Sequence, residues 1–267
     1  MAEAPVCLEN HAMPLIDSAT IAPLAILSAL AQEQQGLIAQ LDQPECVRYA
    51  GRDFWCGRLL GQRVVLALSR VGKVAAATTA AALIERFGCT RIVFTGVAGG
   101  VGDGVQVGDV VVGTSYVQHD MDASPLFPRF EVPLTEMSIF PANTQLAEEL
   151  AQACRVAMLG FSNAPHQAAK VHEGLIASGD RFVNGAQEVV ALVAALHAAG
   201  HQPLAVEMEG AAVAQVCHDH GVAFVAIRTI SDRADDTAHL DFIQFVNEVA
   251  SVVAQRIVHT WLNSLQK

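Results

Sequence analysis

The segment 205–235 constrains the fold of this 267-residue chain most strongly, because it places charged side chains inside apolar sequence. Its second half predicts a buried strand that carries Arg228 and ends at Asp232. In its first half, Glu207 and Glu209 end a shorter apolar stretch, directly before a Gly-Ala-Ala-Val sequence that favours a helix start. A buried charge is costly unless it is paired or hydrogen-bonded. The segment therefore indicates a ligand site built on two buried elements.

Apolar runs of strand length alternate with Ala-rich helical stretches along the chain, which predicts α/β architecture. The sequence is 52% hydrophobic and 16% charged, enough for one large domain with a substantial core. Strands are expected near 24–30, 54–60, 63–69, 91–95, 107–112, 171–178 and 222–230, and helices near 33–41, 73–87, 144–159, 186–199 and 241–265. We expect one sheet covered on both faces, formed by a single domain at 23–267 after a loosely ordered extension at 1–22.

The net charge of −11 and the pI of about 5.3 argue against nucleic acid or an anionic membrane as a partner. No apolar stretch reaches the length that spans a bilayer, and the first residues lack the basic and apolar regions of a secretory signal. Six cysteines without CxxC spacing favour reduced thiols in a cytoplasmic protein. His218 and His220 are two positions apart on a predicted helix and point to different faces, so we expect no metal site there.

Residues 118–143 form a proline-rich, irregular stretch between two predicted elements. A loop of this length inside a compact domain is typical of a functional lid, an interface or a disordered segment. Its three phenylalanines, Phe127, Phe130 and Phe140, argue against full disorder.

Four separated segments carry motifs that occur together, in this chain order, in one known family. Residues 69–76, SRVGKVAA, are similar to the turn S-x-[IV]-G-K-V-x-A, and residues 95–100, TGVAGG, to the glycine loop T-G-[ST]-A-G-G. Residues 174–183, GLIASGDRFV, resemble G-x-I-x-S-G-D-x-F-[IV]. The most specific pair is VEME at 206–209 with RTISDRAD at 228–235. Together these segments resemble the 5′-methylthioadenosine/S-adenosylhomocysteine nucleosidases of the nucleoside phosphorylase superfamily.

The resemblance implies a single-domain, three-layer α/β fold in which a twisted mixed β-sheet, surrounded by helices, partly closes as a barrel. It implies a homodimer that acts on a small-molecule nucleoside without a cofactor or a metal. The implied reaction is hydrolysis of the N-glycosidic bond of 5′-methylthioadenosine or S-adenosylhomocysteine, which releases adenine and a 5-thio-substituted ribose.

The resemblance assigns the two catalytic roles to Asp232 and Glu33. Breaking the bond places negative charge on the purine, so an acid must serve the leaving base and a base must activate water. Asp232 would protonate or hydrogen-bond adenine N7; the alternative is a helix N-cap or loop acid, a role that Asp235 and Asp236 fit better. Glu33 would activate water, but residues 28–33 match the family pattern G-A-M-E-E-E only in the alanine and the last glutamate. An acid stabilised at a helix N-terminus is therefore the alternative for Glu33.

The resemblance also implies how the nucleoside is bound. Glu209 would accept hydrogen bonds from the vicinal ribose hydroxyls, Met208 would lie against the sugar or the base or pack in the core, and Phe182 would stack on adenine. Val183 would meet the polar edge of the purine through its backbone, and Val71 would line the 5′ pocket. The predicted binding set is completed by Ala98, Gly99, Glu207, Arg228, Ser231 and Phe127.

Arg228 needs a carboxylate partner because it lies in an apolar strand. Glu207 and Glu209 are both candidates. Glu207 alternates to the other side of its strand, so it could serve Arg228 or a sheet contact instead of the substrate.

Val97 departs from the family pattern, in which a serine or threonine hydroxyl at this position helps to orient the acid. Ser231 or Thr95 is a candidate to replace that hydroxyl. The glycine segment has no arginine, and a phosphate buried against Val97 would lack donors, so water is the predicted acceptor. Residues 124–130 also differ from the family, and Phe127 is our candidate for the aromatic side chain that reaches the 5′ pocket of the partner subunit.

Two other functions stay open on the sequence alone. One is a related purine nucleosidase or phosphorylase with a different 5′ preference, acting on adenosine, inosine or a futalosine-type compound. The other is a non-catalytic nucleoside-binding relative, for which Val97 and the weak match before Glu33 are the only support.

Overall fold

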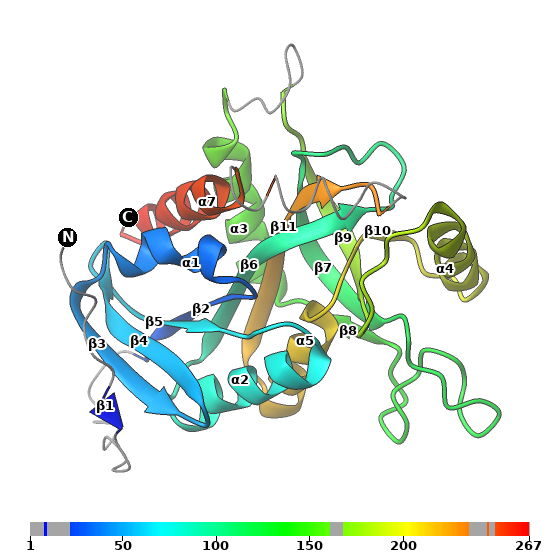
Figure 1. The fold of residues 1–267 in the computed structure, drawn as a ribbon, viewed down its shortest axis with the longest axis horizontal. Helices are drawn as coiled ribbons and strands as arrows, with labels where there is room; N and C mark the ends of the chain where they lie inside the picture. The colour runs from blue at the N-terminus through cyan, green and yellow to red at the C-terminus, as the bar shows by residue number, and fades with distance from the viewer. Residues whose placement is uncertain (1–7, 10–21, 161–167, 235–244, 246–248, 267) are drawn as a thin grey trace.

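The computed structural model describes residues 8–9, 22–160, 168–234, 245 and 249–266 (Figure 1). Most of the predicted extension at 1–22 lies outside these ranges, as do Asp235 and Asp236, so the domain boundary stays a prediction. Within the described ranges, none of the helices combines the length and the apolar character needed to cross a membrane.

The secondary structure follows the predicted alternation of strands and helices. The strands are β1 (Leu8–Glu9), β2 (Leu24–Ser28), β3 (Asp42–Tyr49), β4 (Arg52–Leu59), β5 (Gln62–Leu68), β6 (Arg91–Gly100), β7 (Val110–Gln118), β8 (Ile139–Pro141), β9 (Val171–Ser178), β10 (Pro203–Glu207) and β11 (Ala223–Asp232). The helices are α1 (Ala31–Ile38), α2 (Lys73–Glu85), α3 (Thr144–Ala157), α4 (Ala186–Ala198), α5 (Gly210–His220) and α7 (Ser251–Ser264).

Five strands close a barrel, and the others extend the same sheet. β6, β10, β9, β7 and β11 pair in that order, and β11 returns to β6. β11 is parallel to β6 and antiparallel to β7, so the sheet is mixed. From β6 the sheet continues through β2, β5, β4 and β3 to β1. The predicted fold class, a mixed sheet partly closed as a barrel and surrounded by helices, is confirmed.

Helices cover both faces of this sheet (Figure 1). α1, α3 and α7 lie on one face, where Trp261 and Leu150 pack with Val93 of β6. α2 and α5 lie on the other face, where Leu83 packs with Phe94, the next residue of β6. Because consecutive side chains of a strand point to opposite faces, one apolar run supplies both cores. The apolar strands predicted from the sequence are therefore buried on both sides.

The glycine cluster after residue 95 is part of a strand, which corrects the predicted end of that strand. β6 continues to Gly100, paired with both β10 and β11. A Cβ atom on Gly99 would lie 2.9 Å from Asp232 Oδ1 and 2.9 Å from Ala234 Cβ, closer than real contacts allow. Glycine at this position lets the β6 backbone approach the end of β11, which brings Asp232 against the strand.

One of the cysteines in the described ranges differs from the prediction. Cys56, Cys89, Cys154 and Cys217 are free, and burial raises the pKa of each thiol. Cys46 is disulfide-bonded. The expectation that all six cysteines are reduced is therefore wrong. Cys46 lies in β3, and the spacing of the cysteines in the sequence does not reveal which of them are bonded.

Candidate active site

A cavity of about 370 Å³ lies where β2, β5, β9, β10 and β11 end. Eleven of the predicted site residues line it: Val71, Ala98, Gly99, Phe182, Val183, Glu207, Met208, Glu209, Arg228, Ser231 and Asp232. These residues come from five separate segments of the sequence, and the fold brings them to one place. The cavity combines apolar side chains with the buried carboxyl groups of Glu207, Glu209 and Asp232.

The other two predicted residues are Glu33, whose side chain cannot be placed against the cavity, and Phe127. Glu33 lies in the first turn of α1, shortly after the cavity residues Ala29 and Leu30, and its side chain is outside the described part of the structure. Phe127 lies half-buried in the loop between β7 and β8, away from the cavity of its own chain. The role of each therefore stays a proposal.

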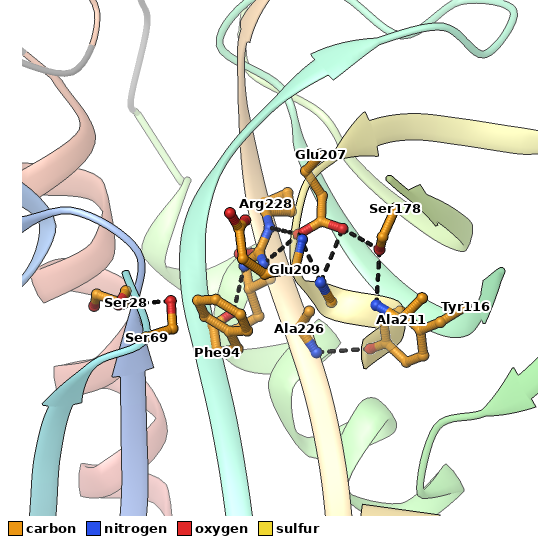
Figure 2. Close-up of polar contacts among 12 residues, drawn as sticks. Ser28, Ser69, Phe94, Tyr116, Ser178, Glu207, Glu209, Ala211, Ala226 and Arg228 are labelled. Carbon is orange, nitrogen blue, oxygen red and sulfur yellow. Dashed lines mark hydrogen bonds and ion pairs between the residues drawn. The ribbon is translucent and has the colours of Figure 1, made fainter. Parts of the chain in front are cut away.

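Arg228 is buried in the middle of this site and pairs with Glu207. Its Nη2 lies 2.7 Å from Glu207 Oε2, and the two side chains are 1% and 3% exposed. Figure 2 shows the guanidinium stacked against Phe94, at 4.1 Å from the ring centroid, while Nη1 donates to the Phe94 carbonyl at 2.9 Å. Of the two candidate partners that the sequence offered, Glu207 forms this ion pair.

The Glu207 carboxylate also accepts the N–H groups at the start of α5 (Figure 2). Gly210 N lies 2.9 Å from each of its oxygens, and Glu209 N lies 3.2 Å from Oε2. The Ser178 hydroxyl donates to Oε1 and accepts the N–H of Ala211 at 2.7 Å. A carboxylate at a helix N-terminus satisfies N–H groups that have no partner within the helix. Glu207 thus lines the cavity, but its oxygens are engaged in holding Arg228 and α5.

Glu209 is 5% exposed and is tied to the turn before α2. Its Oε1 accepts the N–H of Gly72 at 2.8 Å. The next residue, Lys73, begins α2; its N–H donates to Asp180 Oδ1 at 2.7 Å and its Nζ to Asp120 Oδ1 at 2.5 Å. Burial opposes ionisation of Asp120, but the bonds from Lys73 and from the Asp180 N–H outweigh it and hold the pKa of Asp120 below its ordinary value. This ionic cluster fixes the turn that contacts Glu209.

Asp232 ends β11 and is 3% exposed. Its Oδ2 accepts the Ser231 hydroxyl at 2.7 Å, and its Oδ1 accepts the Ala234 N–H at 2.8 Å. Thr95, the other hydroxyl that the sequence offered for this role, lies with its Oγ1 3.2 Å from Ser28 Oγ. A buried carboxyl held at both oxygens beside a cavity is suited to exchange a proton with a bound molecule.

The cavity has other lining residues that were not predicted from the sequence, and two further groups hold the site. Ala29, Leu30, Gly96, Val97, Arg181 and Val206 line the cavity without having been assigned to the predicted site. Arg181 is 73% exposed in its side chain and pairs with Glu188 at 2.9 Å. Ser178 and Gly72 were not singled out, although both stand inside the quoted motifs. Their positions in those motifs were the available signal.

A family model described as the phosphorylase superfamily matches residues 23–263. The chain therefore belongs to the phosphorylase superfamily. It is 35% identical over 227 residues to the 5′-methylthioadenosine/S-adenosylhomocysteine nucleosidase of Bacillus cytotoxicus, an alignment that covers 85% of this chain and 93% of that protein. Within the superfamily, the chain belongs to the family of these nucleosidases.

Solved structures agree with this assignment. The nucleosidase from Neisseria meningitidis in complex with methylthio-immucillin-A is 34% identical, with a TM-score of 0.81, and the alignment covers 91% of this chain and 100% of that one. The futalosine hydrolase of Helicobacter pylori is 28% identical, with a TM-score of 0.80, over 91% of this chain and 98% of that one. The names of these two similar proteins thus refer to different nucleosides.

Proposed function

We propose that this protein hydrolyses the N-glycosidic bond of 5′-methylthioadenosine, S-adenosylhomocysteine or both. Adenine and the 5-thio-substituted ribose are the products. The cavity that places Asp232 and Glu209 beside the apolar side chains of Phe182 and Val71 carries this proposal. It joins an acid, a carboxylate suited to a diol and apolar walls suited to a purine and a thioether.

In the proposed reaction, Asp232 gives its proton to adenine N7 while the C1′–N9 bond breaks and its electron pair moves to the purine. Glu33 accepts a proton from the attacking water as the C1′–O bond forms. Exchange with solvent then returns a proton to Asp232 and removes one from Glu33, so each turnover consumes one water molecule. No step of this proposed reaction needs a cofactor or a metal.

The remaining side chains of the cavity would bind and orient the nucleoside. Glu209 would accept hydrogen bonds from both ribose hydroxyls, and its bond to Gly72 fixes its position beforehand. Phe182 is 39% exposed and would stack on the adenine, with Val183 at the polar edge of the base. Glu207 supports this arrangement through Arg228 and does not need to touch the substrate.

Adenine release from 5′-methylthioadenosine by the purified protein tests this proposal. We expect turnover to be the same with and without inorganic phosphate, because Val97 lines the cavity where a phosphate would need a donor. A coupled adenine assay with S-adenosylhomocysteine and adenosine as parallel substrates measures the 5′ preference. Dependence on phosphate would show a phosphorylase, and absence of adenine after long incubation would contradict hydrolysis.

A futalosine-type nucleoside is the second candidate substrate. The similarity to the Helicobacter pylori futalosine hydrolase supports it, as does the departure of residues 124–130 from the common family pattern. These residues belong to the loop expected to shape the 5′ pocket, so the 5′ substituent is the part of the substrate in question. The same assay with futalosine separates the two: a higher kcat/KM for futalosine than for 5′-methylthioadenosine would favour this second candidate.

We further propose a homodimer in which Phe127 reaches the 5′ pocket of the partner subunit. The loop that carries Phe127 projects away from the sheet in Figure 1, and its Leu126 and Leu134 are 84% and 88% exposed. Exposed apolar side chains that lie together on one loop favour an interaction surface. We expect light scattering to give the mass of two 28.3 kDa chains at micromolar concentration. The mass of a single chain would contradict the dimer.

We also propose a cytoplasmic enzyme that supplies methionine salvage with the thioribose product. The four free cysteines support this location, whereas the disulfide at Cys46 stands against it, because disulfides are rare in the cytosol. Cell fractionation decides the location. Accumulation of 5′-methylthioadenosine after deletion of the gene would support the metabolic role, and unchanged levels would contradict it.

A further inference from the structure

We propose that Ser231 is the positioning residue for the catalytic acid, and that its hydroxyl holds the Asp232 carboxyl in both protonation states. It would replace the hydroxyl that the family pattern has at position 97, where this chain has valine. The inference rests on the proposed function, since it takes Asp232 as the acid.

The end of β11 is irregular at this residue. β11 pairs with β6 in parallel register from Ala223 to Ile230, and the register then shifts so that Asp232 lies opposite Gly99. Ser231 is therefore the extra residue of a β-bulge. In a regular strand, consecutive side chains point to opposite faces, whereas a bulge redirects them. The bulge explains why Ser231 and Asp232 both line the cavity and bond to each other.

The carboxyl of Asp232 is held from three sides. Ser231, itself 1% exposed, donates to Oδ2 at 2.7 Å, and the Ala234 N–H donates to Oδ1 at 2.8 Å. The backbone of Gly99 closes the third side, since an added Cβ there would lie 2.9 Å from Oδ1. A carboxyl confined in this way keeps one orientation toward the cavity, which proton transfer to a bound base requires.

The Ser231 hydroxyl has a second acceptor, so it can stay hydrogen-bonded to Asp232 whether the carboxyl is ionised or protonated. Its Oγ lies 3.4 Å from the carbonyl oxygen of Ala98 as well as 2.7 Å from Asp232 Oδ2. With Asp232 ionised, the hydroxyl donates to Oδ2. With the proton on Oδ2, the hydroxyl can turn to Ala98 and accept from the carboxyl. The shorter, charge-assisted bond is the stronger one, so Ser231 favours the ionised form while keeping a partner for the protonated form.

The matched pair of variants Ser231→Ala and Thr95→Val tests this role. Each removes one buried hydroxyl, but Thr95 bonds Ser28 and lies outside the proposed catalytic machinery. We expect Ser231→Ala to lower kcat for adenine release about 10-fold, because the acid loses its fixed orientation. We also expect the alkaline limb of kcat/KM against pH to move up by about one pH unit, because the ionised acid loses a donor. Thr95→Val should leave both unchanged.

A titration without turnover separates this inference from the proposed function. The ¹³C NMR signals of labelled aspartate carboxyls follow ionisation directly, and the signal that Asp232→Asn removes belongs to Asp232. A higher titration midpoint in Ser231→Ala than in the wild-type protein supports the positioning role even if no nucleoside is cleaved. Equal midpoints, or an equal shift in Thr95→Val, would overturn it even if adenine is released.

Discussion

Replacing Asp232 with asparagine lowers kcat for adenine release by about 10²–10⁴-fold, the usual contribution of a general acid. Asparagine has the same shape, so its amide can still meet the Ser231 hydroxyl and the Ala234 N–H. It cannot give a proton to the departing purine. We therefore expect the loss in kcat while KM for 5′-methylthioadenosine changes little, since the groups that hold the ribose are untouched.

A control variant separates chemistry from folding in this experiment. Asp219→Asn makes the same exchange at an exposed position of α5, outside the cavity, and should keep wild-type kcat. Both variants should show the wild-type far-UV circular dichroism spectrum and melting temperature. If the folded Asp232→Asn variant keeps wild-type kcat, Asp232 is not the acid.

Much of the fold was predictable because apolar runs and helical stretches follow the chain in clear alternation. β9 begins and ends at the predicted residues, and β4 with β5 form the predicted hairpin. β3 was not predicted, because residues 42–49 are mostly polar and exposed and contain Pro44. That strand forms through pairing with β4 and β1 at the open end of the sheet. Because few of its side chains are buried, its sequence has no pattern of apolar residues that would predict a strand.

Most of the residues that line the candidate site stand in the motifs of the sequence, but their mutual contacts were not predictable. The motifs named Glu207, Glu209 and Arg228 together, yet only the folded chain shows that Glu207 holds Arg228. The bond from Gly72 to Glu209 joins residues 137 positions apart, which no local pattern reveals. The choice between Ser231 and Thr95 likewise depended on a β-bulge, whose register shift arises from pairing with β6.

Replacing Glu207 with glutamine should lower the free energy of unfolding by about 3–5 kcal/mol, the usual cost of removing one partner of a buried ion pair. Arg228 would stay buried without a negative charge beside it. The new amide group would also bring N–H donors against existing donors, because both carboxylate oxygens of Glu207 accept the N–H of Gly210, and Oε1 accepts the Ser178 hydroxyl as well. The loss should therefore appear as a lower urea midpoint, measured by unfolding at constant protein concentration.

The exposed ion pair of Arg155 and Glu173 is the control for the loss of unfolding free energy expected in Glu207→Gln. Their side chains are 50% and 35% exposed. Because water solvates both charges when such a pair is broken, Glu173→Gln should lower the free energy of unfolding by no more than about 1 kcal/mol. Equal losses in the two variants would mean that burial adds nothing to the pair of Glu207 and Arg228. A large loss confined to Glu207→Gln would show that the carboxylate that organises the wall of the cavity also holds the barrel and α5 together, since β10, β11 and α5 all meet at its oxygens.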